Sequence, residues 1–384
     1  MPLSNIRVID LTRARSGPTC VRQLADMGAQ VIKVEEPSED GEWGRHGSDF
    51  QNLHRNKRSM VLNLKDARGV DLLKQMVKNT DVLVENYRPE VKKRLGISYE
   101  EMKALNPRLV YASISGFGQT GPYKDRPGYD QVAQGLGGLM SITGHPGEGP
   151  MRAGIPVADL SAGLLAAQGI LVALLEREKS GEGQWVHTSL LEAMVAMLDF
   201  QATRWLMDGE IPPQAANNHP TVIPTGTFKV KDGYINIAST NHMWKKLCNV
   251  LGKSDLTEDG RFSSPGKRSR NRDILNGIIE NILKDHTQEE WIQKLNDAGV
   301  PCGPILSVDQ VFDNQQVKHL GLAKSVEHPT LGTIRILGPA VTLNRTPASI
   351  RTPTAEKGEH TNEILAELGL SVDQIASLRR DVVI

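Results

Sequence analysis

Short apolar segments alternate with amphipathic helix patterns over the first 115 residues, and this alternation constrains the fold more than any other feature. Residues 6–11 and 30–35 have strand patterns, separated by a helix pattern that ends at Gly28. A strand, a helix and a strand within about thirty residues form a βαβ unit, in which the two strands run parallel. The sequence therefore predicts an α/β fold built on a parallel sheet.

The same alternation continues along the chain. Further strand patterns occupy residues 59–64, 81–85 and 109–115. Asp66 is placed to cap one intervening helix, and Ser98 with Glu101 forms a capping box for another. Open parallel sheets bind ligands at the carboxyl ends of their strands. We therefore expect ligand contacts in the loops at residues 12–18, 86–95 and 116–128.

The remainder of the chain has a different pattern. Residues 129–208 look helical, and Asp159 stands before a strongly apolar helix predicted at 160–179. Polar residues and prolines gather at 217–225 and indicate a domain boundary. A hairpin is expected at 226–238, because its centre contains an Asp-Gly turn. At 384 residues the chain is long enough for two domains.

Composition and charge exclude some partners. Lys plus Arg and Asp plus Glu both number 45, so the formal net charge is zero. Nucleic-acid and anionic-membrane partners require a basic surplus, so neither is expected. No signal-peptide layout and no apolar run of about 18 residues is recognised, so no membrane span is predicted. Three widely spaced cysteines favour a reducing cytoplasm over a disulfide framework or a zinc site.

A glycine motif raises the possibility of a dinucleotide site. Residues 116–121 match the pattern GxGxxG after a predicted strand. NAD binding requires a helix to begin there, but Pro122 and Pro127 interrupt the stretch that follows. A glycine loop that lets the backbone approach a ligand is the better interpretation. The histidines and cysteines form no metal-binding motif, so no metal is predicted.

Two other features stay ambiguous on their residues alone. The basic run at 55–58 is either a solvated turn or, with Arg15 and Arg94, a phosphate-binding group. Asp159 is either a helix cap or a catalytic carboxylate. Composition does not separate these alternatives.

A family resemblance does separate them. Residues 115–122 (Ser-Gly-Phe-Gly-Gln-Thr-Gly-Pro) and 156–160 (Pro-Val-Ala-Asp-Leu) are similar to segments of the class III CoA-transferases. That family includes formyl-CoA transferase, carnitine CoA-transferase and succinyl-CoA–glutarate CoA-transferase. Further similar segments follow in the same order along the chain, at residues 6–12, 16–18, 24–29, 31–35, 55–59, 81–89 and 128–130.

The resemblance implies a fold and a quaternary structure. It implies a Rossmann-like large domain with a parallel sheet, formed by residues 1–215 and 326–384. It also implies a smaller α+β domain at residues 216–325. Two such subunits would interlink as a homodimer.

The resemblance also implies the site. Asp159 would be the nucleophilic carboxylate, and no cofactor would be tightly bound, since acyl-CoA and a small carboxylic acid are the substrates. The implied CoA-binding residues are Ala14, Arg15, Ser16, Leu64, Lys65, Asn86, Tyr87, Arg94 and Leu95. The expected reaction moves CoA from an acyl-CoA, such as succinyl-CoA, to a carboxylic acid through mixed anhydrides and an aspartyl-CoA thioester.

Two departures from the family pattern affect these expectations. Many relatives have a basic residue where this chain has Glu36, so one phosphate contact is in doubt. The glycine run near the acceptor site of formyl-CoA transferase is replaced by residues 239–242 (Ser-Thr-Asn-His), which disfavours oxalate as the acceptor.

Two other functions compete with CoA transfer. A 2-methylacyl-CoA racemase has the same fold, but such relatives have histidine where this chain has Tyr129, and tyrosine is a poor base at neutral pH. A non-catalytic CoA-binding protein is the second alternative. The retained carboxylate of Asp159 argues against it.

Overall fold

The computed structural model describes residues 1–38 and 44–384, which divide into two compact units. The first unit is assembled from three parts of the chain, Met1–Leu139, Ala153–Ala202 and Gln316–Ile384. The second contains Met140–Arg152 and Thr203–Gln315. Each unit has its own hydrophobic core.

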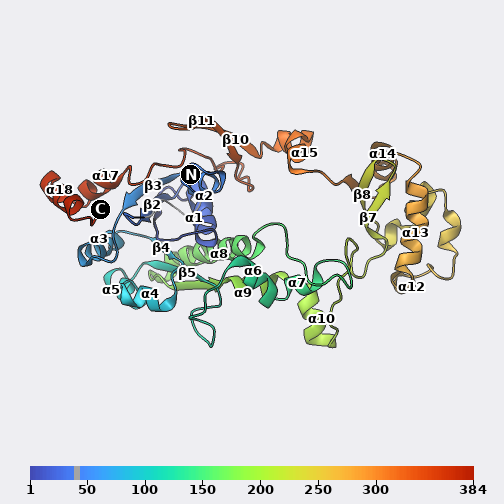
Figure 1. The fold of residues 1–384 in the computed structure, drawn as a ribbon, viewed down its shortest axis with the longest axis horizontal. Coiled ribbons are helices and arrows are strands. Elements are labelled where there is room, and N and C mark those ends of the chain that lie inside the picture. The colour runs from blue at the N-terminus through green and yellow to red at the C-terminus, as the bar shows by residue number, and fades with distance from the viewer. Residues whose placement is uncertain (39–43) are drawn as a thin grey trace. The chain divides into compact units, whose positions relative to one another are not determined.

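A six-stranded parallel sheet forms the centre of the first unit in the described part of the chain (Figure 1). Its strand order is β3-β2-β1-β4-β5-β6, the order of a doubly wound α/β sheet. The predicted α/β class is confirmed. The strands are β1 (Arg7–Asp10), β2 (Gln30–Glu35), β3 (Lys57–Val61), β4 (Val82–Glu85), β5 (Val110–Ser115) and β6 (Trp185–Ser189).

Helices cover both faces of this sheet, because successive strand residues point to opposite sides. Val8 packs into a core with α1 and α8, whereas the next residue, Ile9, packs into a second core with α3, α5, α17 and α18. Tyr111 belongs to this second core. These helices are α1 (Ser16–Asp26), α3 (Ala67–Val77), α5 (Tyr99–Leu105), α8 (Val157–Ser180), α17 (Thr361–Glu367) and α18 (Val372–Arg380).

Shorter elements complete the first unit. A hairpin of β10 and β11 belongs to the part of the chain that returns to it. The two strands pair in antiparallel, with Val326 opposite Ile334. The shorter elements are α2 (Ser48–His54), α4 (Pro89–Arg94), α6 (Asp130–Leu136), α9 (Leu190–Met197), β10 (Ala323–His328) and β11 (Gly332–Leu337).

The second unit packs helices against a three-stranded antiparallel sheet of order β7-β8-β9. The hairpin predicted around Asp232 and Gly233 is confirmed, since Val230 pairs with Gly233. The elements of this unit are β7 (Thr225–Val230), β8 (Gly233–Ala238), η1 (Asn241–Met243), α11 (Trp244–Val250), η2 (Ser254–Thr257), α12 (Pro265–Arg270), α13 (Arg272–Leu283), α14 (Gln288–Asp297), β9 (Cys302–Pro304) and α15 (Val308–Asp313). Three more helices contain the unit borders: α7 (Leu139–Ile142), α10 (Phe200–Asp208) and α16 (Gln315–Leu320).

Strand β6 corrects one prediction from the sequence. Residues 129–208 were expected to be helical, but Trp185–Ser189 pairs in parallel with β5. The strand has five residues and lies at the sheet edge, directly between α8 and α9. An edge strand this short shows little of the alternation that identifies a strand.

Helix α8 corrects two further predictions. It begins at Val157, so Asp159 lies inside its first turn and does not precede it. Its length and composition are also sufficient for a membrane crossing, so the expectation that no segment has this character is wrong. About 44% of its apolar window is buried inside the protein, and it packs against α1, as the core helix of a folded unit does.

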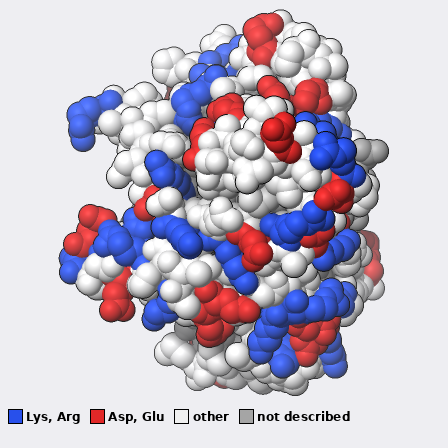
Figure 2. Space-filling view, turned by 90° about the vertical axis from the view of Figure 1, so that its left-hand side faces the viewer, with Lys and Arg blue, Asp and Glu red and all other residues white. Residues whose placement is uncertain are grey.

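Acidic and basic side chains are interspersed on the molecular face in Figure 2, in agreement with a formal net charge of zero. A balanced surface of this kind does not attract an anion over a long distance. Affinity for an anionic ligand must therefore come from cations gathered locally.

Candidate active site

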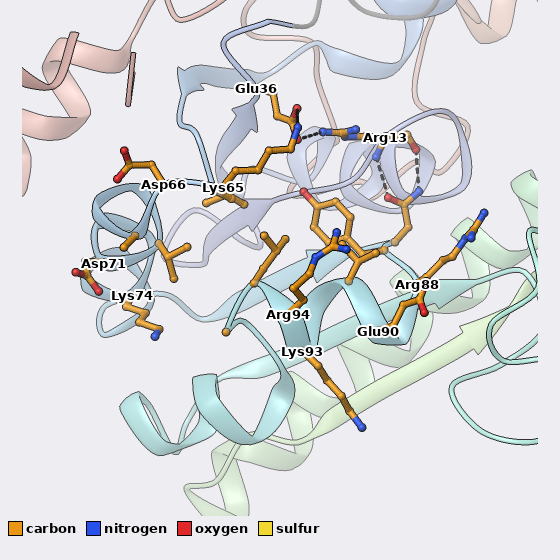
Figure 3. A pocket seen from close by; sticks show the side chains of 18 of the residues that line it. Arg13, Glu36, Lys65, Asp66, Asp71, Lys74, Arg88, Glu90, Lys93 and Arg94 are labelled. Carbon is orange, nitrogen blue, oxygen red and sulfur yellow. Dashed lines mark hydrogen bonds and ion pairs between the residues drawn. The ribbon is translucent and has the colours of Figure 1, made fainter. Parts of the chain in front are cut away.

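A cavity of about 1,240 Å³ opens at the carboxyl end of the parallel sheet in the first unit (Figure 3). Its walls come from loops that follow β1, β2, β3 and β4, together with α4. Strands β1 and β4 are neighbours at the point where the strand order of the sheet reverses, which is where doubly wound sheets bind ligands. The location of the cavity therefore agrees with the ligand loops expected from the sequence.

The cavity brings together most of the residues that the resemblance assigned to CoA. The residues among them that line it are Leu64, Lys65, Asn86, Tyr87, Arg94 and Leu95. Ala14, Arg15 and Ser16 are outside its lining and lie where the loop after β1 enters α1. The backbone of Ala14 has a φ of 58°, which turns the chain into that helix.

Side-chain hydrogen bonds hold the loops after β1 and β4 together. The Asn86 side chain accepts a hydrogen bond from the Arg13 amide at 2.9 Å and donates one to the Arg13 carbonyl at 2.8 Å. Asn86 therefore fixes the backbone that carries Arg13 into the cavity. Arg13 was not predicted as a site residue, although it lies in one of the loops expected to contact ligand.

A buried ion pair between the end of β4 and α4 holds another part of the cavity lining in place. Glu85 accepts hydrogen bonds from the Lys92 ammonium and from the Tyr87 amide, both at 2.8 Å. Lys92 also donates to Gln119 in the glycine loop at 2.6 Å. Buried charges are tolerated when paired and hydrogen-bonded in this way. The pair fixes α4, and with it Arg94, against the sheet.

The glycine loop itself does not form a dinucleotide site. After residues 116–121 no helix begins until Asp130, so no helix N-terminus faces a pyrophosphate there.

Among residues 1–38 and 44–384, no group of three or more His, Cys, Asp or Glu side chains could hold a metal ion.

Asp159 is positioned by a second carboxylate, that of Asp130. One Asp130 oxygen accepts hydrogen bonds from the Ala158 amide at 2.8 Å and from the Asp159 amide at 3.3 Å. The other oxygen accepts from Gln134 at 2.6 Å. Asp130 thus caps α8 from outside the helix, which explains why the helix begins before Asp159. Neither Asp130 nor Gln134 is predicted as a site residue, because the backbone amides that they hold, at residues 153, 158 and 159, lie about twenty to thirty residues along the chain.

This capping also occupies backbone amides near Asp159 that could otherwise stabilise an oxyanion. The Ala158 and Asp159 amides are bound to Asp130, and the Gly137 amide donates to the Ala133 carbonyl at 2.8 Å.

The surroundings of Asp159 alter its acidity. The pKa of its carboxyl is raised to about 6, mainly by burial and further by the negative charge of Asp130. The charge of Arg15 and a hydrogen bond from Ser16 lower the pKa, but by less. A carboxyl with this pKa is about nine-tenths ionised at pH 7. It is also more basic than an exposed aspartate, and perturbed acidity of this kind is typical of functional carboxylates.

Comparison with known proteins identifies the family of the chain. Residues 3–361 match the model of CoA-transferase family III. The chain is similar to succinate–glutarate CoA-transferase of Agrobacterium fabrum, with 37% identity over 96% of both chains. It is also similar to succinyl-CoA:glutarate CoA-transferase of Mus musculus, with 36% identity over 96% of this chain and 86% of that one.

The fold has solved relatives as well. A CAIB/BAIF family protein from Brucella suis superposes with a TM-score of 0.85 and 34% identity, over 96% of this chain and 99% of that one. The chain belongs to CoA-transferase family III, and it is an enzyme of that class.

Proposed function

We propose that this enzyme moves CoA from succinyl-CoA to a second carboxylic acid, with the Asp159 carboxylate as its covalent nucleophile. The observation that supports this proposal most strongly is the environment of Asp159. Its carboxylate is largely buried and its pKa is raised, yet it stays mostly ionised at neutral pH. Ser16 and Arg15, at the start of α1, interact with it from the loop that also carries Arg13 into the cavity.

The proposed reaction begins with the donor thioester. A carboxylate oxygen of Asp159 attacks the thioester carbonyl, the C–S bond breaks, and CoA leaves as a thiolate. The product is a mixed anhydride of Asp159 and the donor acid. The thiolate then attacks the Asp159 carbonyl carbon, which releases the donor carboxylate and forms an aspartyl-CoA thioester. Covalent catalysis thereby divides one difficult step into easier ones.

The second half of the reaction mirrors the first. The acceptor carboxylate attacks the aspartyl thioester, releasing the thiolate and forming a second mixed anhydride. The thiolate attacks the acceptor carbonyl of this anhydride, giving the new acyl-CoA and restoring the Asp159 carboxylate. No proton is gained or lost overall. The reaction therefore needs Asp159 ionised at the start and at the end.

The choice of a dicarboxylate donor rests on the similarity to dicarboxylate-using relatives. Two of the relatives are named for succinate or succinyl-CoA and glutarate.

We also propose a cytoplasmic homodimer. Leu164, Leu171, Val172 and Leu175 are exposed on α8. Their spacing places them along one side of a helix, and exposed apolar surface of this kind is typical of an interface. The cysteines Cys20, Cys248 and Cys302 are all unpaired, as expected in a reducing compartment.

The test of substrate class uses a panel of acids. The enzyme is incubated with succinyl-CoA and each of several mono- and dicarboxylic acids, and new acyl-CoA species are identified by mass spectrometry. We expect transfer from succinyl-CoA to at least one acid. Transfer only between monocarboxylates would contradict the dicarboxylate donor while leaving CoA transfer intact.

A further inference from the structure

One carboxylate in the cavity is bound to two of its cations. Glu36, the first residue after β2, pairs with the Arg13 guanidinium at 2.7 Å and with the Lys65 ammonium at 3.2 Å (Figure 3). The three residues come from loops after three different strands, and all line the cavity. The Glu36 side chain is only 20% exposed, whereas those of Arg13 and Lys65 are 42% and 72% exposed.

The other cations of the cavity differ from Arg13 and Lys65 in their pairing within the described part of the chain. Among the described residues, no carboxylate forms an ion pair with Lys74, Arg88, Lys93 or Arg94. In Figure 3 Arg94 points toward the wall formed by Arg13 and Lys65, whereas Lys93 points away from it. The cavity therefore has an available cation at Arg94 and two occupied cations at Arg13 and Lys65.

Glu36 stays charged over the physiological pH range. Burial raises the pKa of its carboxyl, but the hydrogen bond from Lys65 and the charge and hydrogen bond of Arg13 together lower it by more. A phosphate that approaches Arg13 and Lys65 must therefore compete with a carboxylate already bound to both, and it is repelled by that carboxylate as well.

We propose that Glu36 determines how the cavity recognises phosphate: it competes with a phosphate group of the ligand for Arg13 and Lys65. This inference rests on the proposed function, because it takes the ligand to be CoA. CoA has a diphosphate and a separate phosphate monoester on its ribose, and dephospho-CoA lacks only the monoester. The enzyme then discriminates weakly between the two, because the cations that could hold the dianionic monoester are bound to Glu36.

The test measures binding of CoA and of dephospho-CoA by isothermal titration calorimetry, in the wild type and in Glu36→Gln. Gln keeps the shape of the side chain and removes its charge. We expect CoA to bind roughly two- to tenfold more tightly to Glu36→Gln, the range expected for releasing partly exposed ion pairs. The affinity for dephospho-CoA should increase by less than about twofold in the same variant. The increase in affinity for CoA should become smaller as salt is added.

Two further variants serve as controls. Glu90→Gln removes the same charge from another part of the cavity, where no ion pair with Glu90 exists among the described residues. This variant should change the affinities for CoA and for dephospho-CoA by the same factor. Lys65→Gln should weaken CoA binding more in the Glu36→Gln background than in the wild type, because only there is Lys65 released.

Three outcomes contradict parts of this account, and they can be told apart. Weaker CoA binding by Glu36→Gln would mean that Glu36 orients Arg13 and Lys65 for the ligand, which overturns the inference. An equal increase in affinity for both ligands would indicate a general charge effect and would also overturn the inference about Glu36. Failure of the wild type to bind either ligand would overturn the proposed function itself.

Discussion

The carboxylate of Asp130 accepts a hydrogen bond from the backbone amide of Asp159 at 3.3 Å, so one aspartate holds the other at the start of α8. The same carboxylate raises the pKa of the Asp159 side chain through its negative charge. Asp130 therefore acts on the proposed nucleophile by position and by charge. These two effects can be separated by experiment.

The variant Asp130→Asn removes the charge and keeps an oxygen that can accept from the helix amides. The Asp159 pKa should fall below its wild-type value of about 6, because one of the two causes that raise it is gone. The acid limb of the pH profile of kcat/KM should therefore move to lower pH. A profile identical to the wild type, with the fold intact, would show that Asp130 has no electrostatic effect on the reaction.

The pH dependence of the wild type follows from the same pKa. Asp159 must be ionised to attack, so kcat/KM should be constant above about pH 7 and decrease about tenfold per pH unit well below pH 6. Rates measured across this range in a buffer of constant ionic strength test the expectation. An acid limb with its midpoint near 4 would mean that burial does not perturb the carboxyl.

A buried carboxylate at Asp159 should also reduce stability at neutral pH. Its pKa in the folded protein is about 6, above the value of 3.8 in the unfolded chain, so the folded state binds the proton more tightly. Stability from this group is fully present below about pH 4 and is lost as pH rises through about 6. The variant Asp159→Asn has no carboxyl to titrate and lacks this loss. From pH 5 to pH 8 the wild type should therefore lose about 1 kcal/mol more of its free energy of unfolding than the variant does.

Denaturant titrations at the two pH values measure this difference. Equal pH dependence in the two proteins would contradict a raised pKa. The comparison is independent of activity, so it tests the environment of Asp159 even before a substrate pair is found.

The contribution of Arg94 to CoA binding can be tested against its neighbour. Arg94→Ala should raise the KM for acyl-CoA about ten- to hundredfold and leave the KM for the acceptor acid nearly unchanged, because a charge-assisted phosphate contact is lost. Lys93→Ala is the matched control, since Lys93 is on the same helix but points away from the wall formed by Arg13 and Lys65. Similar effects of both variants would exclude a specific role for Arg94.

The predictions from the sequence were most accurate where the signal is local. The Gln30–Glu35 strand, the Asp66 cap and the capping box of Ser98 and Glu101 all occur as expected, because each depends on residues within one turn or one strand. The loops after β1 and β4 do line the cavity, since the parallel sheet alone determines where strand ends meet.

Features that depend on distant residues could not be read from the sequence. The true start of α8 depends on Asp130, which lies in a different helix. The pairing of Glu36 depends on Arg13 and Lys65, which reach it from two other loops. Nothing near any of these residues in the sequence indicates its partner.

The central claim is that Asp159 becomes covalently attached to CoA. Asp159→Asn keeps the size of the side chain, so CoA binding should survive while transfer falls below a few per cent of the wild type. If Asp159 served only the helix, the Asn variant would be nearly fully active. The activity of this variant therefore separates the two roles.

The most direct measurement is trapping of the intermediate. The wild type is incubated with succinyl-CoA without an acceptor acid, treated with hydroxylamine, digested and analysed by mass spectrometry, with Asp159→Asn treated in parallel. The account predicts a hydroxamate at Asp159 in the wild type and none in the variant. An unmodified Asp159 in the wild type, together with an Asn variant that still transfers CoA, would contradict it.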